Sequence, residues 1–482
     1  MIPTPPRLLL EKRKSGNTAT APRGVSLPMA SAVALMAVAQ STLVHGHGSE
    51  LEEVEIVGRH TEIIGQAVSA SQGIIGQEEL SLRPLMRTGE ILETVPGMVV
   101  TQHSGSGKAN QYFLRGFNLD HGTDFLTRFD RMPVNLRSHG HGQGYTDISF
   151  IIPELLESIE YKKGPYYADV GDFSGAGSAN MTPMQSMSGG PGGLLQLGAG
   201  KDGFGRLLGA GSLEVGPGDL LLGFEGQVYD GPWTDISEDV RKTNGLARYT
   251  WNHDANTFSL MFMAYDNSWD SADQIPERAV EQGLIDPLGS LDRTLGGKTR
   301  RSSLSGSFNW EAGRHRNEIN AWIIDYDFKL WSNFTYLLEN PVQGDQFEQV
   351  DDRKIYGGDW SLKWLGEIGG GHLHHMLGVQ FRYDDIGAVG LYNTRERERL
   401  GVVRLDSVDE TSVGIYYELE WRINDRWRSV IGMRGDYYWF DVDSNLEQNS
   451  GSESDGIFSP KASLIYTIDE VSEAYLSGGF GF

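Results

Sequence analysis

The sequence of 482 residues contains no cysteine. This absence excludes a disulfide framework, a zinc–thiolate site and a catalytic cysteine. Basic residues are scarce, with 41 Lys and Arg against 65 Asp and Glu, which gives a formal net charge of −24 at pH 7. This balance argues against a nucleic-acid partner, because phosphate binding needs a basic surface. The acidity does not by itself predict a cationic ligand, because a solvated acidic surface is the commoner explanation.

Beyond the first forty residues, the sequence also lacks any continuous apolar span of the ~20 residues that a membrane helix requires. The N-terminal apolar run, Val25 to Ala39, is shorter and follows five basic residues. It ends in the small residues Ala37-Val38-Ala39. This order is typical of a secretory leader, so residues 1–39 are predicted to be a signal peptide. The alternative is a disordered N-terminus with a chance apolar run.

Residues 191–482 alternate apolar and polar positions in stretches of roughly ten residues, the length of membrane strands. In Thr411 to Arg422, for example, one face would carry Val413, Ile415, Tyr417, Leu419 and Trp421. Short turns alternate with long polar loops, which are predicted near 230–243, 267–300, 328–355, 384–410 and 441–458. This alternation of loop length is typical of outer-membrane barrels.

Aromatic residues at the ends of these stretches are predicted to form girdles at the two membrane interfaces. They include Trp251, Tyr265, Trp269, Trp331, Trp421 and Trp427. For any one of them, an ordinary position in a β core is the alternative.

The same pattern predicts about thirteen strands. Bacterial single-chain barrels have even strand numbers, and a plugged lumen is associated with about 22 strands. The sequence stops at Phe482, within a predicted strand. We therefore expect a mainly β fold with a large antiparallel transmembrane barrel, truncated at about 13 of an expected 22 strands. The alternative is that Phe482 is a genuine barrel-ending aromatic and that the strand count is wrong.

Residues 61–190 are less regular and are predicted to form a separate α/β domain. A stretch with helical spacing ends at Val95-Pro96-Gly97. Arg115-Gly116 follows in "QYFLRGFN", and Lys163-Gly164-Pro165 ends the sequence "IEYKKGP". A glycine-rich segment, 175–180, comes next. The order and spacing of these pieces closely resemble the plug domain of TonB-dependent receptors.

The resemblance implies an N-terminal plug inside the barrel, ligand binding at the outer face and plug movement driven by force, with no enzymatic activity. Implied partners are TonB with its inner-membrane energising proteins, outer-membrane lipid and a small-molecule or metal-chelate ligand. The family also carries a TonB box, a short segment that pairs with TonB by strand addition. Within the N-terminal extension, residues 40–60, the sequence Glu53-Val54-Glu55-Ile56-Val57 resembles it. The alternative is simply the first strand of the plug.

The cargo is the least determined feature. His139 and His141 are separated by one glycine, and His121 and Asp124 lie nearby in the sequence. Imidazoles on a flexible backbone could bind a transition metal or a metal chelate, although this spacing is not that of a strong metal motif. A structural role in a glycine-rich plug loop is equally compatible. Lesser candidates are His45, His47, His103, Asp120 and Asp147.

Other ligand sites are not supported by the sequence. His372, His374 and His375 follow a predicted periplasmic turn and are discounted as a cargo site. The glycine-rich "GDFSGAGSAN" lacks the Lys and Ser/Thr of a phosphate-binding loop, so no nucleotide site or resident cofactor is predicted. The competing functions are a passive porin-like or enzymatic barrel and a non-functional receptor fragment. The plug-like domain discriminates, because a porin would begin its strands soon after the leader.

Overall fold

The computed structural model describes residues 59–60, 64–85, 87–102, 106–187 and 192–482. All of them belong to one compact unit, Glu52–Phe482. The predicted signal peptide, the Glu53–Val57 segment, and His45, His47 and His103 lie outside the described residues. Within the described ranges, no helix is long and apolar enough to cross a membrane.

The N-terminal part is a small mixed domain, as expected for a plug. Its main sheet has the order β1-β2-β8-β9-β6-β7, in which only β6 and β9 are parallel. The predicted helix before Pro96 is a 3-10 helix. The elements of the sheet are β1 Arg59–His60, β2 Gln72–Gly76, β6 Phe125–Phe129, β7 Met132–Pro133, β8 Leu156–Lys163 and β9 Gly177–Pro183. A second sheet holds β3 Met98–Thr101, β4 Gln111–Leu114 and β5 Phe117–Asn118, and the helices are α1 Gln77–Ser81, η2 Thr88–Thr94 and η3 Pro153–Leu155.

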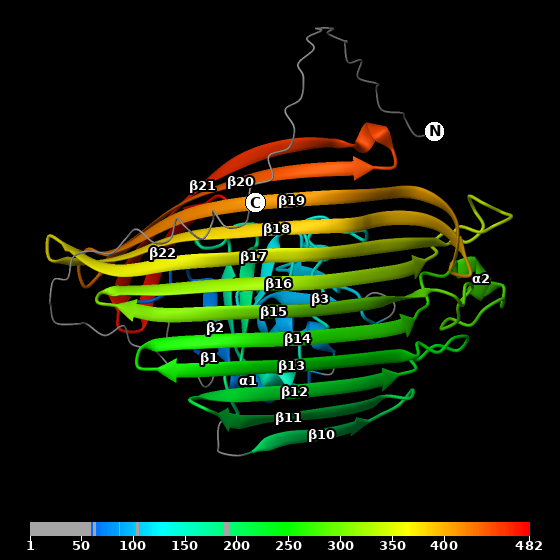
Figure 1. Ribbon diagram of the computed structural model, residues 1–482, viewed down its shortest axis with the longest axis horizontal. Helices are drawn as coiled ribbons and strands as arrows, with labels where there is room; N and C mark the ends of the chain where they lie inside the picture. Colours follow the sequence, from blue (N-terminus) through cyan, green and yellow to red (C-terminus); the bar gives the residue numbers. More distant parts are fainter. Residues whose placement is uncertain (1–58, 61–63, 86, 103–105, 188–191) are drawn as a thin grey trace, which may run out of the picture. The chain divides into compact units, whose positions relative to one another are not determined.

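The rest of the chain forms one antiparallel sheet of thirteen strands in sequence order, here called the wall. This confirms the predicted mainly β fold and strand count. In the described chain the sheet is open, with β10 and β22 at its edges. Figure 1 shows the strands following one another from β10 at the bottom to β20 near the top. The strands are β10 Gly193–Ala199, β11 Gly205–Val215, β12 Gly218–Tyr229, β13 Val240–His253, β14 Asn256–Asp270, β15 Gly296–Ala312, β16 His315–Ser332, β17 Phe347–Ile368, β18 Gly371–Arg395, β19 Glu398–Arg422, β20 Trp427–Ser444, β21 Gly451–Asp469 and β22 Ser472–Gly479.

The two ends of the wall differ in their connections. At one end the strands are joined by short turns, such as 216–217, 254–255 and 369–370. At the other end lie long loops, including 271–295, which contains α2 Glu277–Glu281, and 333–346. We call this the long-loop end.

Two of the predicted long loops are wrong. Residues 384–410 lie almost wholly in β18 and β19, which are joined by a two-residue turn at Glu396-Arg397. The region 441–458 likewise continues β20 and β21, apart from residues 445–450, which contain η4 Glu447–Asn449. Residues 398–404 of β19 are exposed on both faces. Where neither face is covered, a strand has no reason to alternate apolar and polar residues, so its sequence looks like a loop.

The two faces of the wall have opposite chemistry. The outer face carries exposed apolar side chains such as Phe262, Ile323 and Ile415. The inner face contacts the plug and buries charged side chains such as Glu225, Lys242 and Arg353. A polar lumen inside an apolar outer band is the arrangement of membrane barrels.

The girdle prediction holds for only part of the aromatic set. Trp251, Trp421 and Trp427, all near the short turns, are more than one third exposed. Tyr265 and Trp269 are buried on the inner face near the long-loop end, where the wall packs against the plug, so their assignment to the girdle was wrong. Trp331 lies on the side of β16 that carries Ile323, but its ring is buried there and lies 5.0 Å from the Arg397 guanidinium carbon, so it is not exposed as a girdle residue would be.

Candidate ligand site and plug–wall interface

The predicted plug motifs lie next to one another in the plug. Gly97 has a φ of +87°, and its carbonyl oxygen accepts a hydrogen bond from Arg115 N at 2.8 Å. Pro96 O accepts a hydrogen bond from Lys163 Nζ at 2.9 Å. Val95 is fully buried beside them. The helix end and the two later strands are therefore joined by hydrogen bonds between motif residues.

Two turns in these motifs use left-handed backbone. Arg115 and Gly116, with φ of +53° and +85°, form the two-residue turn between β4 and β5 that such a hairpin favours. Gly164 follows β8 with a φ of +88°, and Pro165 O accepts a hydrogen bond from Lys461 Nζ of the wall at 3.1 Å. These contacts explain the residue types, while the contribution of the motif to transport stays a prediction.

The His-Gly-His segment of the plug lies against the inner face of β17. Gln349 Nε2 donates to Gly140 O at 2.7 Å, and Gly140 N donates to an Asp351 carboxylate oxygen at 3.1 Å. Arg353 Nη2 donates to Ser138 O at 2.5 Å. Three alternating residues of one strand therefore hold residues 138–140. Gln349 and Asp351 lie two and four residues after Phe347, where β17 begins at the long-loop end. This contact is therefore in the long-loop half of the wall.

The glycine at position 140 has a specific packing reason. A Cβ atom there would lie 2.7 Å from Val350 O of β17, whereas one at Gly142 would lie 3.7 Å from its nearest neighbour, the ring of His121. Gly140 therefore permits the close approach to the wall, and Gly142 is not constrained in the same way.

His139 is built into this contact. Its Nδ1 accepts a hydrogen bond from His141 N at 3.1 Å, which places the ring hydrogen on Nε2, 3.1 Å from the Tyr326 hydroxyl. The ring stacks on Tyr145 with centroids 3.9 Å apart. Burial, followed by the neighbouring Arg353 charge, lowers the pKa of His139 well below its usual value, so the imidazole is neutral. Because both ring nitrogens are engaged, His139 fits a structural role better than a free metal ligand.

The other candidate ligands are only partly assembled. The His121 and His141 ring centroids are 4.7 Å apart, and His141 Nδ1 lies 2.9 Å from Gln349 Oε1. Asp124 accepts a hydrogen bond from the Thr123 hydroxyl at 2.8 Å. Asp120 lies 3.7 Å from His121 Nε2, and Asp147 accepts a hydrogen bond from Ser149 N at 2.9 Å. Across the described ranges, no group of three or more His, Asp or Glu side chains has an arrangement that could hold a metal ion.

The three histidines that were discounted as a cargo site lie beside a short turn, as predicted. His372, His374 and His375 begin β18 directly after the turn at 369–370. His375 stacks on Trp364 with ring centroids 4.7 Å apart, and its Nδ1 is 2.7 Å from the Tyr417 hydroxyl. They belong to the wall and not to the plug contact.

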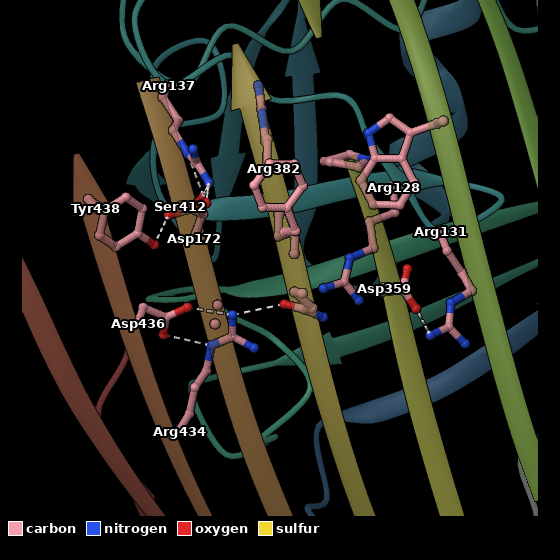
Figure 2. Close-up of a pocket in the computed structure, with 17 residues that line it drawn as sticks. Arg128, Arg131, Arg137, Asp172, Asp359, Arg382, Ser412, Arg434, Asp436 and Tyr438 are labelled. Atoms are coloured by element: carbon pink, nitrogen blue, oxygen red, sulfur yellow. Dashed lines mark hydrogen bonds and ion pairs between the residues drawn. The ribbon is translucent and has the colours of Figure 1, made fainter. Parts of the chain in front are cut away.

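A cavity of about 70 Å³ lies between the plug and β16 to β20 (Figure 2). It is called here the arginine cavity. From the plug it is lined by Arg128, Arg131, Arg137 and Asp172, and from the wall by Asp359, Gln380, Arg382, Ser412, Arg434, Asp436 and Tyr438, together with glycine and apolar residues.

These wall residues were not predicted from the sequence, although a signal was present. Arg382 and Asp384 on β18, and Arg434 and Asp436 on β20, are two residues apart and therefore share a face. Each arginine holds its own acid at 2.6 to 2.7 Å and also donates to a plug carbonyl, Asn135 O for Arg382 and Ala168 O for Arg434. Charged i, i+2 pairs inside otherwise alternating strands would have pointed to the inner face.

Comparisons with known proteins agree with this architecture. Residues 65–178 match the TonB-dependent receptor plug domain, and residues 223–482, more than half of the chain, match the TonB-dependent receptor-like β-barrel. The vitamin B12 transporter BtuB of Vibrio vulnificus (strain CMCP6) is 27% identical over 176 residues, which are 35% of this chain and 27% of BtuB.

Solved structures show the same fold. The unliganded ferric citrate transporter FecA superposes with a TM-score of 0.69 at 14% identity, over 85% of this chain and 62% of FecA. The copper transporter OprC gives 0.64 at 16% identity, over 88% of this chain and 64% of OprC. The ferric-catecholate import receptor Fiu from E. coli K12 also gives 0.64, at 15% identity, over 85% and 69% of the two chains.

The chain therefore spans less than two thirds of the length of FecA and OprC and about a quarter of BtuB. The matched family consists of transporters and receptors of the Gram-negative outer membrane, and not of enzymes. On the match to both its plug and its barrel, this chain belongs to the TonB-dependent receptor family.

Proposed function

We propose that this chain acts in the TonB-dependent uptake of a scarce small ligand across the outer membrane. The observation that carries the proposal is a plug domain bound to the charged inner face of a wall whose outer face is apolar. A plug that fills the lumen has to rearrange before any ligand passes. The outer membrane has no nucleotide supply, so the energy for that rearrangement would come from the inner membrane.

The N-terminal residues would supply the export and coupling steps. In this proposal residues 1–39 direct export, and Glu53-Val54-Glu55-Ile56-Val57 within the extension 40–60 pairs with TonB. The plug would comprise residues 61–190 and the wall residues 191–482. Force on the coupling segment would reach β1 and β2, because β1 pairs with β2, and β2 with β8, which ends at Lys163.

The proposed cargo is a metal or a metal chelate of siderophore type. His121 and His141 support it, because their rings lie close together on a plug segment in the long-loop half of the wall. His139 is a weaker candidate, because it already uses both ring nitrogens. Asp124 is also weaker, because its carboxylate already accepts a hydrogen bond from the Thr123 hydroxyl. Relatives of this fold include transporters of ferric citrate, copper and vitamin B12 and several siderophore receptors.

A proline scan of the coupling segment tests the energy requirement. Val54→Pro removes a backbone donor that strand addition needs, whereas Val54→Thr keeps it and serves as the matched control. Growth would be measured under depletion of single metals in a strain that depends on this chain. We expect the proline variant to lose growth under one depletion and the threonine variant to keep it. Equal growth of both would favour a passive porin-like channel, and no metal-dependent phenotype would rule out the metal cargo.

A further inference from the structure

We infer that the arginine cavity is a binding site for a small oxyanion, such as the carboxylate group of a ligand or a free tetrahedral anion. The cavity lies deeper in the lumen than the His-Gly-His contact: Arg382 is eleven residues from the short-turn end of β18, and Asp359 is nine from that of β17. It is therefore distinct from the candidate ligand site at the plug surface.

The lining favours a negative charge. Among the described residues that line the cavity there are five arginines and three aspartates. The acids that neutralise Arg382 and Arg128 are Asp384 and Asp169, and neither is among the lining residues. The guanidinium groups thus face the cavity while part of the compensating charge stands behind them. The charges nearest to the cavity therefore favour an oxyanion over a cation.

Two plug arginines have donor capacity left. Arg137 uses Nε and Nη2 for Asp172 and the Ser412 hydroxyl, but its buried Nη1 has no hydrogen-bond partner in the described chain. Arg128 donates to Asp169 O at 3.0 Å, and its contact with the Asp169 carboxylate is loose at 3.9 Å. A buried charged donor without a partner is unfavourable, and an oxyanion would supply the missing acceptor.

The remaining groups hold the site in shape. Tyr438 donates to Asp172 at 2.6 Å, and its ring lies 5.1 Å from the Arg137 guanidinium carbon. Figure 2 shows the Arg434 side chain reaching from β20 toward the same space. A Cβ atom at either Gly171 of the plug or Gly414 of β19 would come within 2.4 Å of this guanidinium, so both glycines keep room for it.

Size limits the ligand to a small group. One water molecule needs about 10–15 Å³ of such space, so a cavity of about 70 Å³ admits a few heavy atoms. Guanidinium forks match carboxylate and phosphate-like oxygens in geometry as well as charge. A whole chelate would not fit with the plug in place, but one acidic group would. The use of this site by passing cargo rests on the proposed function, whereas the binding itself is independent of transport.

Binding is tested on the purified full chain in detergent, without TonB. Thermal unfolding is followed with sulfate or with acetate, each against chloride at the same ionic strength. Crystals soaked in selenate locate the anion by the anomalous signal of selenium. We expect sulfate or acetate to raise the melting temperature more than chloride does, and a selenium peak in the cavity. Stabilisation by sulfate alone would indicate a free tetrahedral anion, and stabilisation by acetate a carboxylate group.

Arg128→Gln is expected to weaken the apparent anion affinity at least tenfold. Arg300→Gln is the matched control, because Arg300 is an exposed arginine of β15 that pairs with Asp266 at the surface. Equal affinity in Arg128→Gln and the unmodified chain would overturn the inference. The absence of selenium from the cavity of the unmodified chain, together with no stabilisation by acetate, would overturn it as well, even if the variant failed to fold. Neither result would bear on the proposed uptake function, which the growth experiment tests separately.

Discussion

The two faces of the wall reverse the usual relation between polarity and burial. On the inner face, Arg353 is 1% exposed and Asp351 fully buried, although both are charged. On the outer face of the same sheet, Ile415 is 54% exposed and Phe262 50%. In water such an outer face would be an aggregation hazard, and such an inner face would be costly. Both become favourable when lipid covers the outside and the plug supplies hydrogen bonds on the inside.

The difference shows that a charged side chain can be buried on the inner face when it has hydrogen-bond and ion-pair partners there. Arg353 holds the Asp351 carboxylate at 2.6 Å, lies 3.4 Å from Asp384 and donates to Ser138 O of the plug. Its position is determined by three neighbours at once. Ile415 has no such requirement, because lipid chains accept any apolar side chain.

The largest expected effect comes from removing one partner of a buried ion pair on the inner face. Arg353→Met leaves Asp351 buried without a cation, and removing one partner of a buried ion pair costs about 3–5 kcal/mol. Urea unfolding in detergent, followed by tryptophan fluorescence, would measure the loss. Arg300→Met is the control, because Arg300 pairs with Asp266 at the surface, where the two side chains are 67% and 57% exposed, so a change below about 1 kcal/mol is expected. Similar losses in both variants would show that the inner ion pairs are no more important than surface pairs.

The second-largest expected effect tests where the apolar band of the outer face lies. Ile415→Arg places a charge in the apolar band and should cost about 2–4 kcal/mol in a bilayer. Val402→Arg is the matched control, because Val402 lies on the same strand with nearly equal exposure, 52% against 54%, but in the extension toward the long-loop end. There the arginine would contact water and change stability by about 0.5 kcal/mol or less. Equal costs at the two positions would contradict the placement of the apolar band.

The contrast between Ile415 and Val402 also shows how far the sequence could predict the fold. Because lipid covers one face and the plug the other, apolar and polar residues alternate with a period of two. The strand around Ile415 and the number of thirteen strands were therefore predictable. Around Val402 neither face is covered, the period disappears, and the strand was taken for a loop. Tyr265 and Trp269 were misplaced for a related reason, since an aromatic at a strand end fits a girdle and a plug contact equally well.

The candidate site was less predictable than the fold. The His-Gly-His segment could be singled out from its composition, but the reason for Gly140 lies in Val350 O, far along the chain. Arg353 meets Ser138 across 215 residues of sequence. Local patterns carry no information on such pairings, so neither the β17 contact nor the arginine cavity could be derived without the structure.

The glycines of this segment give a smaller and sharper test of the inner face. Gly140→Ala would push a methyl group to 2.7 Å from Val350 O, and overpacking of this kind costs about 1–3 kcal/mol. Gly142→Ala meets only an ordinary contact at 3.7 Å and should be close to neutral. The free energy of unfolding of the two variants, measured in the same detergent, decides the point. Equal effects would mean that the plug segment does not press on β17 in solution.

The smallest expected effect concerns pH and His139. Burial holds the pKa of this imidazole below the value of about 6.5 expected in the unfolded chain. Between these two values the unfolded chain binds a proton at this residue that the folded chain does not, so the contribution of His139 to stability should fall as the pH drops from about 7.5 to 5. His121, whose pKa burial also lowers, adds a contribution of the same sign. His139→Gln removes the contribution of His139, so the melting temperature should fall less between about pH 7.5 and pH 5 than it does in the unmodified chain. His253→Gln, at an exposed position near a short turn, is the matched control. An unaltered slope in His139→Gln would mean that this ring can take up a proton inside the folded plug, and so that the contact with β17 opens more readily than its hydrogen bonds suggest.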